Sequence, residues 1–358
     1  DPRILKKECV SLVKSGYNVV LIVSNGLPDE NYKNVNIIDI GKFKNRFSRF
    51  IKSNFLMYRA IIRLKPVIVH FHDPELIPLG LFLRLLQFKV IYDIHEDYVT
   101  SIREKHYLNR PLKIIFSYVV QFAEFLSYRF LHTIIAEKYY TTRFNKSTPI
   151  LNYPAIDKLE IGKMERKFLQ KKLLYTGNLT GIRGGRLIAD LLNYDEELSI
   201  TCIGLSSVKL ANQMYNIAGI NSKRLTIIGI DEYIPFEKII EFYRKDEWLA
   251  GISFFEPSID NENKELTKFF EYMAVGLPVL ASNFSVWKKL IEGNKIGYCF
   301  NTDDIKSIIK KIDEMYTDKN QCSLMSKKGI FLTSKHYNWK NEEKKLNLFY
   351  SNVLNIYK

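Results

Sequence analysis

The chain has 358 residues, of which 46% are hydrophobic and 26% charged, a balance that is typical of a globular protein and excludes a disordered one. Its formal net charge of +14 is uneven: the first 154 residues hold 23 Lys and Arg against 13 Asp and Glu, or +10, and the remainder holds only +4. The length predicts two domains or one large one, and the basic charge suits a partner that carries phosphate groups.

The four cysteines, at positions 9, 202, 299 and 322, form no CxxC pair. Scattered cysteines favour a reducing compartment and argue against a structural zinc site. We therefore expect a cytoplasmic protein.

The chain opens on a helix. The segment DPRILKKECVSLVKSG predicts a helix that ends at Gly16, and a strand follows over Asn18–Ser24. An α/β domain that begins with a helix lacks an element, so we expect the sequence given to be truncated at its start or to leave out a first strand.

The segment Lys42–Lys65 is basic and rich in aromatic residues, and it holds no acidic residue. A helix of this kind can lie in an anionic membrane interface, or it can pack one face on a sheet with its charges in water, and the sequence favours neither. Nucleic acid is a less expected partner, because no recognised nucleic-acid module accompanies the charge.

Two strands of one sheet follow, Val67–His72 and Val90–His95. Between them, Asp73 is predicted to cap a helix over Pro74–Leu86, with proline at the first helical position.

A metal site near these strands is not expected. His70, His72 and Asp73 are metal-ligand residue types, but a metal needs a further converging group and the helix cap already uses Asp73.

His95 and Glu96 lie at the carboxyl end of the second strand, where Rossmann-like domains bind their ligands. His95 is either a functional residue or a histidine that only caps a strand end. Glu96 is either a base for an acceptor hydroxyl or a loop carboxylate.

The apolar region Leu112–Ile135 is interrupted by charged and polar residues, so it is not expected to span a bilayer. It is predicted to hold most of a helix over Asn109–Leu131 and the start of a strand over His132–Glu137. The charged segment Asp157–Lys171 that comes later predicts a surface linker.

A second α/β series begins with the strand Leu173–Asn178, and the glycine-rich turn Leu179–Gly185 leads from it into a helix through Leu192. Free N–H groups and the helix dipole at such a turn attract an anion. Arg183 adds a full charge and a fork of donors that suits a diphosphate. Later strands at Leu198–Gly204, Leu225–Gly229 and Trp248–Phe254 alternate with helices at Val208–Gly219 and Pro235–Lys245, which predicts a second doubly wound sheet.

The segment Glu265–Ser282 carries the most specific pattern. A helical period places Lys268 and Glu271 on one face, Gly276 ends the helix, and a short apolar run predicts a buried parallel strand. Lys268 and Glu271 therefore lie on a helix that is followed directly by a strand of a sheet.

This segment resembles the signature of retaining glycosyltransferases with the GT-B fold, in particular glycosyltransferase family 4. In that signature, a glutamate within Lys-x-x-Glu-Tyr-Met-Ala-x-Gly-x-Pro-Val binds the ribose of a nucleotide-sugar. The residues that match are Lys268, Glu271, Tyr272, Met273, Ala274, Gly276, Pro278 and Val279. An ordinary amphipathic helix with a solvated Glu271 is less expected, because every position agrees in order.

The resemblance implies two facing Rossmann-like doubly wound domains with a cleft between them. Residues 1–153 would form an acceptor-side domain that lacks its first strand and turn. Residues 154–335 would bind the nucleotide-sugar, and residues 336–358, including a helix over Tyr337–Tyr357, would cross back to the first domain.

The resemblance also implies roles for single residues. Gly177, Asn178, Arg183 and Gly184 would bind the donor diphosphate with help from Lys268, and Glu271 would bind the ribose. His95 would reach the donor sugar near its reacting carbon. We expect His95, Arg183 and Lys268 to carry catalysis, with no metal and no cofactor besides the sugar donor.

One position departs from the family. Asn263 replaces the first of two glutamates seven residues apart, the one that usually contacts the donor sugar. An asparagine can still hydrogen-bond a hydroxyl, so Asn263 and Glu96 are kept as possible sugar or acceptor contacts.

The expected function is retaining transfer of a sugar to a glycan or lipid-linked acceptor in cell-surface polysaccharide biosynthesis, at the inner face of the cell membrane. The alternatives are a nucleotide-sugar epimerase of the same fold, and an inactive nucleotide-sugar-binding or membrane-surface protein.

Overall fold

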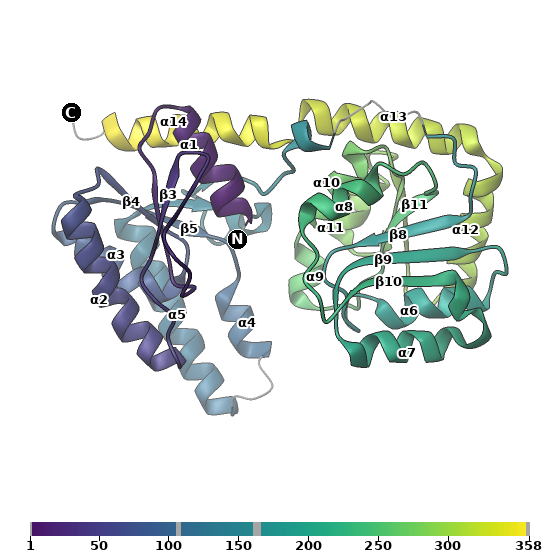
Figure 1. The fold of residues 1–358 in the computed structure, drawn as a ribbon, viewed down its shortest axis with the longest axis horizontal. Coiled ribbons are helices and arrows are strands. Elements are labelled where there is room, and N and C mark those ends of the chain that lie inside the picture. Colours follow the sequence, from purple (N-terminus) through teal and green to yellow (C-terminus); the bar gives the residue numbers. More distant parts are fainter. Residues whose placement is uncertain (1, 105–108, 160–165, 356–358) are drawn as a thin grey trace. The chain divides into compact units, whose positions relative to one another are not determined.

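The computed structural model describes residues 2–104, 109–159 and 166–355. The chain divides into two compact units, each described here by itself. Unit 1 comprises Asp1–Asn152 with Trp339–Lys358, and unit 2 comprises Tyr153–Asn338. Figure 1 shows both units and the labels of their elements.

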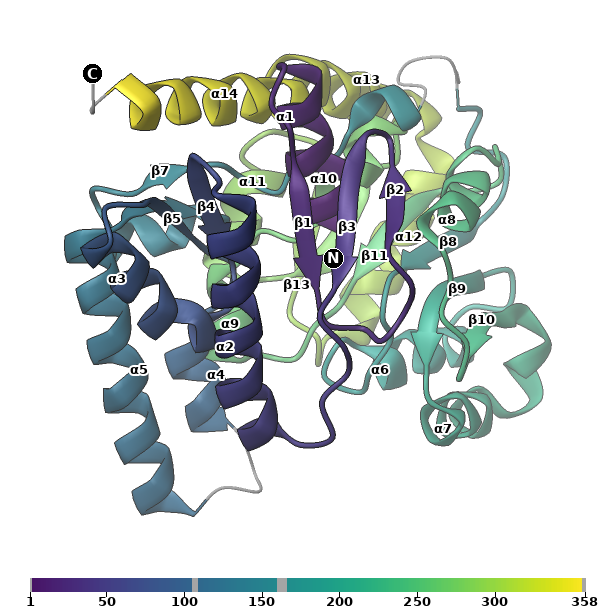
Figure 2. The same cartoon turned by 60° about the vertical axis from the view of Figure 1, so that its left-hand side comes forward.

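Unit 1 holds two sheets. In the first, β1 (Val20–Val23) pairs in parallel with β3 (Val35–Asp39), which pairs in antiparallel fashion with β2 (Glu30–Tyr32). Figure 2 shows these three strands side by side. The second sheet is parallel throughout, in the order β4 (Ile68–Phe71), β5 (Lys89–Ile94), β6 (His132–Ile135) and β7 (Thr148–Pro149).

The buried strands of unit 1 are apolar runs, as parallel strands covered on both faces require. Five of the six residues of β5 are buried, among them Asp93. The helical elements of the unit are η1 (Ile4–Cys9), α1 (Val10–Lys14), α2 (Arg46–Leu64), η2 (Pro74–Leu76), α3 (Ile77–Leu85), α4 (Tyr98–Glu104), α5 (Arg110–Phe130), η3 (Lys138–Thr142) and α14 (Trp339–Asn355).

The helix α14 belongs to unit 1 although it comes last in the chain. The Nε1 of Trp339 donates to Ser11 Oγ at 2.9 Å, and Lys89 Nζ donates to the Leu354 carbonyl at 2.9 Å. Glu342 accepts from the backbone N–H of Leu151. These bonds fix α14 against the first helices and the sheet. The last predicted residue of this helix, Tyr357, lies outside the described residues.

Unit 2 holds one six-stranded parallel sheet in the order β10-β9-β8-β11-β12-β13. The strands are β8 (Lys172–Thr176), β9 (Ser199–Ser206), β10 (Leu225–Ile230), β11 (Ala250–Ser253), β12 (Val279–Ser282) and β13 (Gly297–Phe300). The chain forms β8 first, adds β9 and β10 on one side of it, and then crosses to place β11 on the other side of β8. The carboxyl ends of β8 and β11 therefore form a topological switch point, the usual ligand position in such sheets.

Helices cover both faces of this sheet (Figure 1). They are η4 (Ile156–Lys158), α6 (Gly185–Asp190), η5 (Leu191–Asn193), α7 (Val208–Ala218), η6 (Gly219–Arg224), α8 (Phe236–Tyr243), α9 (Ile259–Asn263), α10 (Thr267–Ala274), α11 (Ser285–Ile291), α12 (Ile305–Thr317) and α13 (Lys319–Lys335).

The predicted surface linker over 157–171 is wrong at Leu159, Arg166 and Phe168, which are buried, whereas Asp157, Lys167, Leu169 and Gln170 are exposed; residues 160–165 lie outside the described residues. Arg166 is buried and its guanidinium donates to the carbonyls of Tyr243, Lys245 and Val275, at the ends of α8 and α10. Burial lowers the pKa of Arg166 to about 10. A charged residue is inside here because it satisfies carbonyls that the helix ends leave unpaired.

Candidate functional site

In the turn after β8, the backbone lies very close to the backbone of neighbouring segments. Gly177 has φ +92° and Gly184 has φ +85°, both in the left-handed region. A Cβ on Gly184 would lie 1.9 Å from the carbonyl oxygen of Phe254, just beyond β11, so only glycine fits there. The turn is thereby pressed against the end of β11, at the switch point.

Lys268, in the first turn of α10, reaches into this switch point. Its Nζ lies 3.8 Å from the ring centroid of Tyr175 on β8, and 3.8 Å from the position that a Cβ on Gly177 would take. The Nζ atom is buried, and no residue that the structure describes offers it a hydrogen-bond partner. Burial, together with the charge of Arg183, lowers the pKa of Lys268 well below its ordinary value. A buried ammonium without a partner is costly and marks a place for an anion.

Arg183 supplies a second cation at the same place. Its Nη1 donates to the Asn178 carbonyl at 3.3 Å, and its guanidinium carbon lies 5.8 Å from the centroid of Phe255. The Nζ of Lys268 lies 5.3 Å from the same centroid. An exposed cation and a buried one thus border a single aromatic ring at the end of β11.

Glu271, on the next turn of α10, is held by residues that the sequence did not single out. The hydroxyl of Tyr243 donates to Glu271 Oε2 at 2.8 Å and lies 2.9 Å from Thr176 Oγ1. Burial and the charge of Glu271 raise the pKa of Tyr243 well above its ordinary value, so the phenol stays neutral and donates. No sequence pattern links Tyr243 to a residue 28 positions away.

Asn263 is the last residue of α9 and is half-buried, four residues before α10 begins.

In unit 1, His95 belongs to a buried network centred on Asp93. His95 Nε2 lies 2.6 Å from Asp93 Oδ2, and His72 Nδ1 lies 3.0 Å from the same nitrogen. The guanidinium of Arg3 donates to Asp93 Oδ2 at 3.0 Å and to Glu8 Oε1 at 2.7 Å. Arg3, Glu8 and Asp93 were not predicted; the clustering of charged residues in the first helix was the only available signal.

The charges of this network follow from burial and from Arg3. Burial alone would raise the pKa of Asp93, but the charges of Arg3 and His95 hold it well below its ordinary value. Burial and the charge of Asp93 raise the pKa of Glu8 well above its ordinary value. Burial also lowers the pKa of His70 and His72, which keeps both imidazoles neutral near pH 7.

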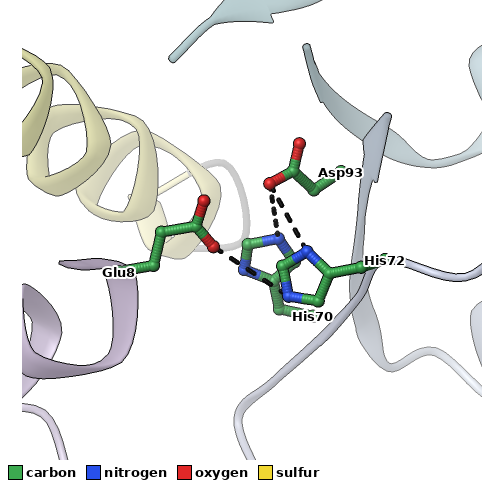
Figure 3. Close-up of side chains that lie close together, drawn as sticks. All are labelled: Glu8, His70, His72 and Asp93. Atoms are coloured by element: carbon green, nitrogen blue, oxygen red, sulfur yellow. Dashed lines mark ion pairs between the residues drawn. The ribbon is translucent and has the colours of Figure 1, made fainter. Parts of the chain in front are cut away.

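The capping role predicted for Asp73 is wrong, and with it one reason for not expecting a metal site in unit 1; the absence of a metal stays a prediction. Asp73, at the N-cap position of η2, makes no side-chain cap hydrogen bond; it is exposed and lies 3.9 Å from Arg49. The structure instead gathers Glu8, His70, His72 and Asp93, with one donor atom from each lying within 4.8 Å of the others (Figure 3). The converging groups that the sequence argument missed come from η1 and β5.

Glu96 is exposed, and no hydrogen bond to its side chain is found in the described part of the chain. The contact of Glu96 with an acceptor stays a prediction.

Comparison with known proteins gives one family match and several similar folds. Residues 267–330, from α10 into α13, match the family model described as "Glycosyl transferases group 1". No curated protein matches the chain significantly.

Solved structures resemble the chain over nearly its whole length. Sucrose-phosphate synthase from Thermosynechococcus elongatus is 14% identical, with a TM-score of 0.71 over 97% of this chain and 92% of that chain. HepE from Anabaena, solved with UDP and glucose, is 10% identical, with a TM-score of 0.69 over 93% and 99%. WaaG, a glycosyltransferase involved in lipopolysaccharide biosynthesis, is 12% identical, with a TM-score of 0.69 over 97% and 95%. These likenesses show that the chain has the GT-B fold.

Proposed function

We propose that this chain is a retaining glycosyltransferase of the family 4 type, which moves a sugar from a nucleoside-diphosphate donor to a glycan or lipid-linked acceptor. The family match over α10–α13 and the GT-B fold support a transferase enzyme. The observation that carries the proposal is the buried Nζ of Lys268, which makes no hydrogen bond to a described residue, beside the glycine turn at the switch point of β8 and β11.

The donor diphosphate would bind between Lys268 and Arg183. Two cations bordering the Phe255 ring match the charge of a diphosphate, and the cost of burying Lys268 is offset once an anion binds. The backbone N–H groups of Gly177 and Gly184 already donate to the carbonyls of Ile203 and Gly181, so these glycines would serve by letting the turn approach the anion closely. The N–H of Asn178, which donates to no carbonyl among the described residues, would complete this site. Charge that develops on the departing diphosphate would be stabilised without a metal ion.

Glu271 would accept hydrogen bonds from the ribose hydroxyls. Tyr243 holds one of its oxygens, which fixes the plane of the carboxylate before the donor arrives. His95, oriented by Asp93, would contact the donor sugar near its reacting carbon. Asn263 and Glu96 would contact sugar or acceptor hydroxyls.

UDP is the first nucleotide to test, because the similar HepE structures contain UDP and UDP-glucose. We expect UDP, or another of GDP, ADP and TDP, to raise the melting temperature of the chain. At one hundred times Kd the gain in unfolding free energy is about 2.7 kcal/mol, an easily measured shift. The shift, measured against the EDTA-treated chain without nucleotide, should survive EDTA and disappear in Glu271→Ala.

If no diphosphate shifts the melting temperature, the donor site is not functional and the proposal fails. If the shift needs a divalent metal, a metal-free diphosphate site is excluded.

An anionic membrane surface is the partner that we propose for unit 1, in line with an acceptor that is lipid-linked. No described helix is both long and apolar enough to cross a bilayer. The helix α5 nevertheless turns Ser117, Glu124 and Ser127 inward and exposes apolar side chains on its other face. Those that share this face are Ile114, Ile115, Tyr118, Val119, Phe122 and Phe125.

The helix α2 carries basic residues beside an exposed apolar stripe of its own. Ile51, Phe55 and Ile62 are exposed, and the basic residues Lys52 and Arg59 lie beside them on the helix. An exposed apolar stripe bordered by basic residues is typical of helices that lie in the headgroup region.

We expect the chain to float with vesicles that contain phosphatidylglycerol and not with pure phosphatidylcholine. Arg59→Gln should weaken partitioning about fivefold, since each basic residue near the surface contributes about 1 kcal/mol. Phe122→Ser together with Phe125→Ser should abolish it. Lys319→Gln, at an exposed position on α13, is the matched control and should have no effect. Equal flotation of all variants would contradict this surface.

A further inference from the structure

In the network around Asp93, the proposed transfer reaction assigns roles only to His95 and to Asp93, the carboxylate that orients it. Glu8 on η1, His70 on β4, His72 just beyond β4 and Asp93 on β5 form a second constellation in unit 1 (Figure 3). Glu8 lies 62 to 85 positions before the other three, and all four belong to the types that bind metal ions.

The donor atoms converge. The His72 ring lies between the two carboxylates, with Nδ1 3.4 Å from Asp93 Oδ2 and Nε2 3.9 Å from Glu8 Oε2. His70 Nε2 lies 4.0 Å from Asp93 Oδ2. Figure 3 draws these three approaches, two from Asp93 and one from Glu8.

Buried atoms of this cluster lack partners. Within the described ranges, Glu8 Oε2, Asp93 Oδ1 and His70 Nε2 are buried and accept or donate no hydrogen bond. Glu8 and Asp93 are 2% and 0% exposed. Because buried polar atoms are nearly always satisfied, three orphans in one cluster point to a missing ligand.

Arg3 and Tyr350 contact the donor residues and hold them in place. Arg3 engages Oε1 of Glu8, which leaves Oε2 of that carboxylate for another partner. It also donates to Asp93 Oδ2, the oxygen that faces the two imidazoles, and so holds that oxygen in place. The Tyr350 hydroxyl lies 2.7 Å from His70 Nδ1, so the Nε2 of that ring faces the cluster. Outer contacts of this kind orient metal ligands and fix their tautomers.

We propose that Glu8, His70, His72 and Asp93 bind one divalent first-row transition metal ion, for which Zn²⁺ is the probe. Two imidazoles and two carboxylates are a donor set that Zn²⁺ accepts, whereas Mg²⁺ and Ca²⁺ prefer oxygen donors alone. Metal–donor bonds of about 2.0–2.2 Å place tetrahedral donors roughly 3.4 Å apart, so binding draws the cluster together.

The charge of the cluster fits a dication. Two carboxylates and Arg3 sum to −1 when both acids are ionised, as metal binding requires of them. Bound there, the ion ties η1 to β4 and β5, and so fixes the carboxylate that orients His95. This inference does not depend on the sugar transfer reaction.

The test is a titration of the tag-free, chelator-stripped chain with Zn²⁺ by calorimetry and with Co²⁺ by visible absorption. We expect one equivalent of metal, with the absorption of a tetrahedral Co²⁺ site. Glu8→Gln and His72→Gln should each lower the affinity at least tenfold. His132→Gln, a histidine of unit 1 outside the cluster, should bind as the wild type does.

Both variants keep a hydrogen-bonding side chain of similar size. His72, 17% exposed, is the more tolerant position if Glu8→Gln does not fold. The proposal is overturned if the wild type binds no more metal than His72→Gln, or if the Co²⁺ spectrum is that of a hexahydrated ion.

Discussion

Replacement of Lys268 by methionine is expected to lower kcat/KM by about a thousandfold, or about 4 kcal/mol, while the free energy of unfolding stays unchanged or rises. Methionine keeps the unbranched apolar stem that packs near Tyr175 and Gly177 but removes the buried charge. In the free chain that ammonium makes no hydrogen bond to a described residue and contacts only the Tyr175 and Phe255 rings, while burial disfavours its charge and lowers its pKa. We therefore expect its loss to cost no folding energy. In the reaction it would stabilise the departing diphosphate.

The measurements are steady-state kinetics and denaturant unfolding of Lys268→Met, with Lys289→Met as control. Lys289 is exposed on α11, so its replacement should change neither quantity. Since the pKa of Lys268 is lowered, nucleotide affinity of the wild type should fall as pH rises through that pKa, because deprotonation removes the charge. The variant should lack this step. A variant that is less stable yet fully active would assign Lys268 to folding alone.

Arg183→Ala is expected to reduce turnover roughly a hundredfold to a thousandfold without loss of stability. Arg183 is exposed, and the side-chain hydrogen bond that it donates to the Asn178 carbonyl is long at 3.3 Å. Its removal therefore disturbs little in the free chain. Arg183→Lys should recover only part of the rate, because lysine keeps the charge but loses the two-donor fork.

Arg186→Ala is the matched control, since Arg186 is exposed one turn further along, on α6. Its rate should equal that of the wild type. If Arg183→Ala turns over normally, or if Arg186→Ala is equally impaired, the proposed contact of Arg183 with the diphosphate is wrong.

The sequence predicted the α/β class, the GT-B fold and most elements to within a few residues. The helix–turn–strand predicted from Glu265 to Ser282 is present as α10 and β12. It could be predicted because a 3.6-residue helical period and a short apolar run are both local properties of the sequence. For the same reason Lys268 and Glu271 stood out together, three residues apart on one helix. Their roles in donor binding stay predictions.

Contacts between distant residues were beyond sequence reasoning. Nothing in the chain indicates that Tyr243 holds Glu271, that Arg166 satisfies the ends of α8 and α10, or that α5 turns its polar residues inward. The alternation of residues along α5 predicts a two-faced helix, but only its neighbours decide which face is covered.

The cluster of Glu8, His70, His72 and Asp93 shows most clearly what the sequence determines and what only the tertiary structure determines. The sequence by itself determined that β4 and β5 are parallel strands with polar residues at their ends, because apolar runs and helix-forming segments alternate locally. Only the tertiary structure decided that η1 lies beside those ends, with Glu8 facing the strand that carries Asp93, 85 residues away. The physical reason is that a sequence pattern fixes which way a side chain points along its own element, whereas packing of whole elements decides what it meets.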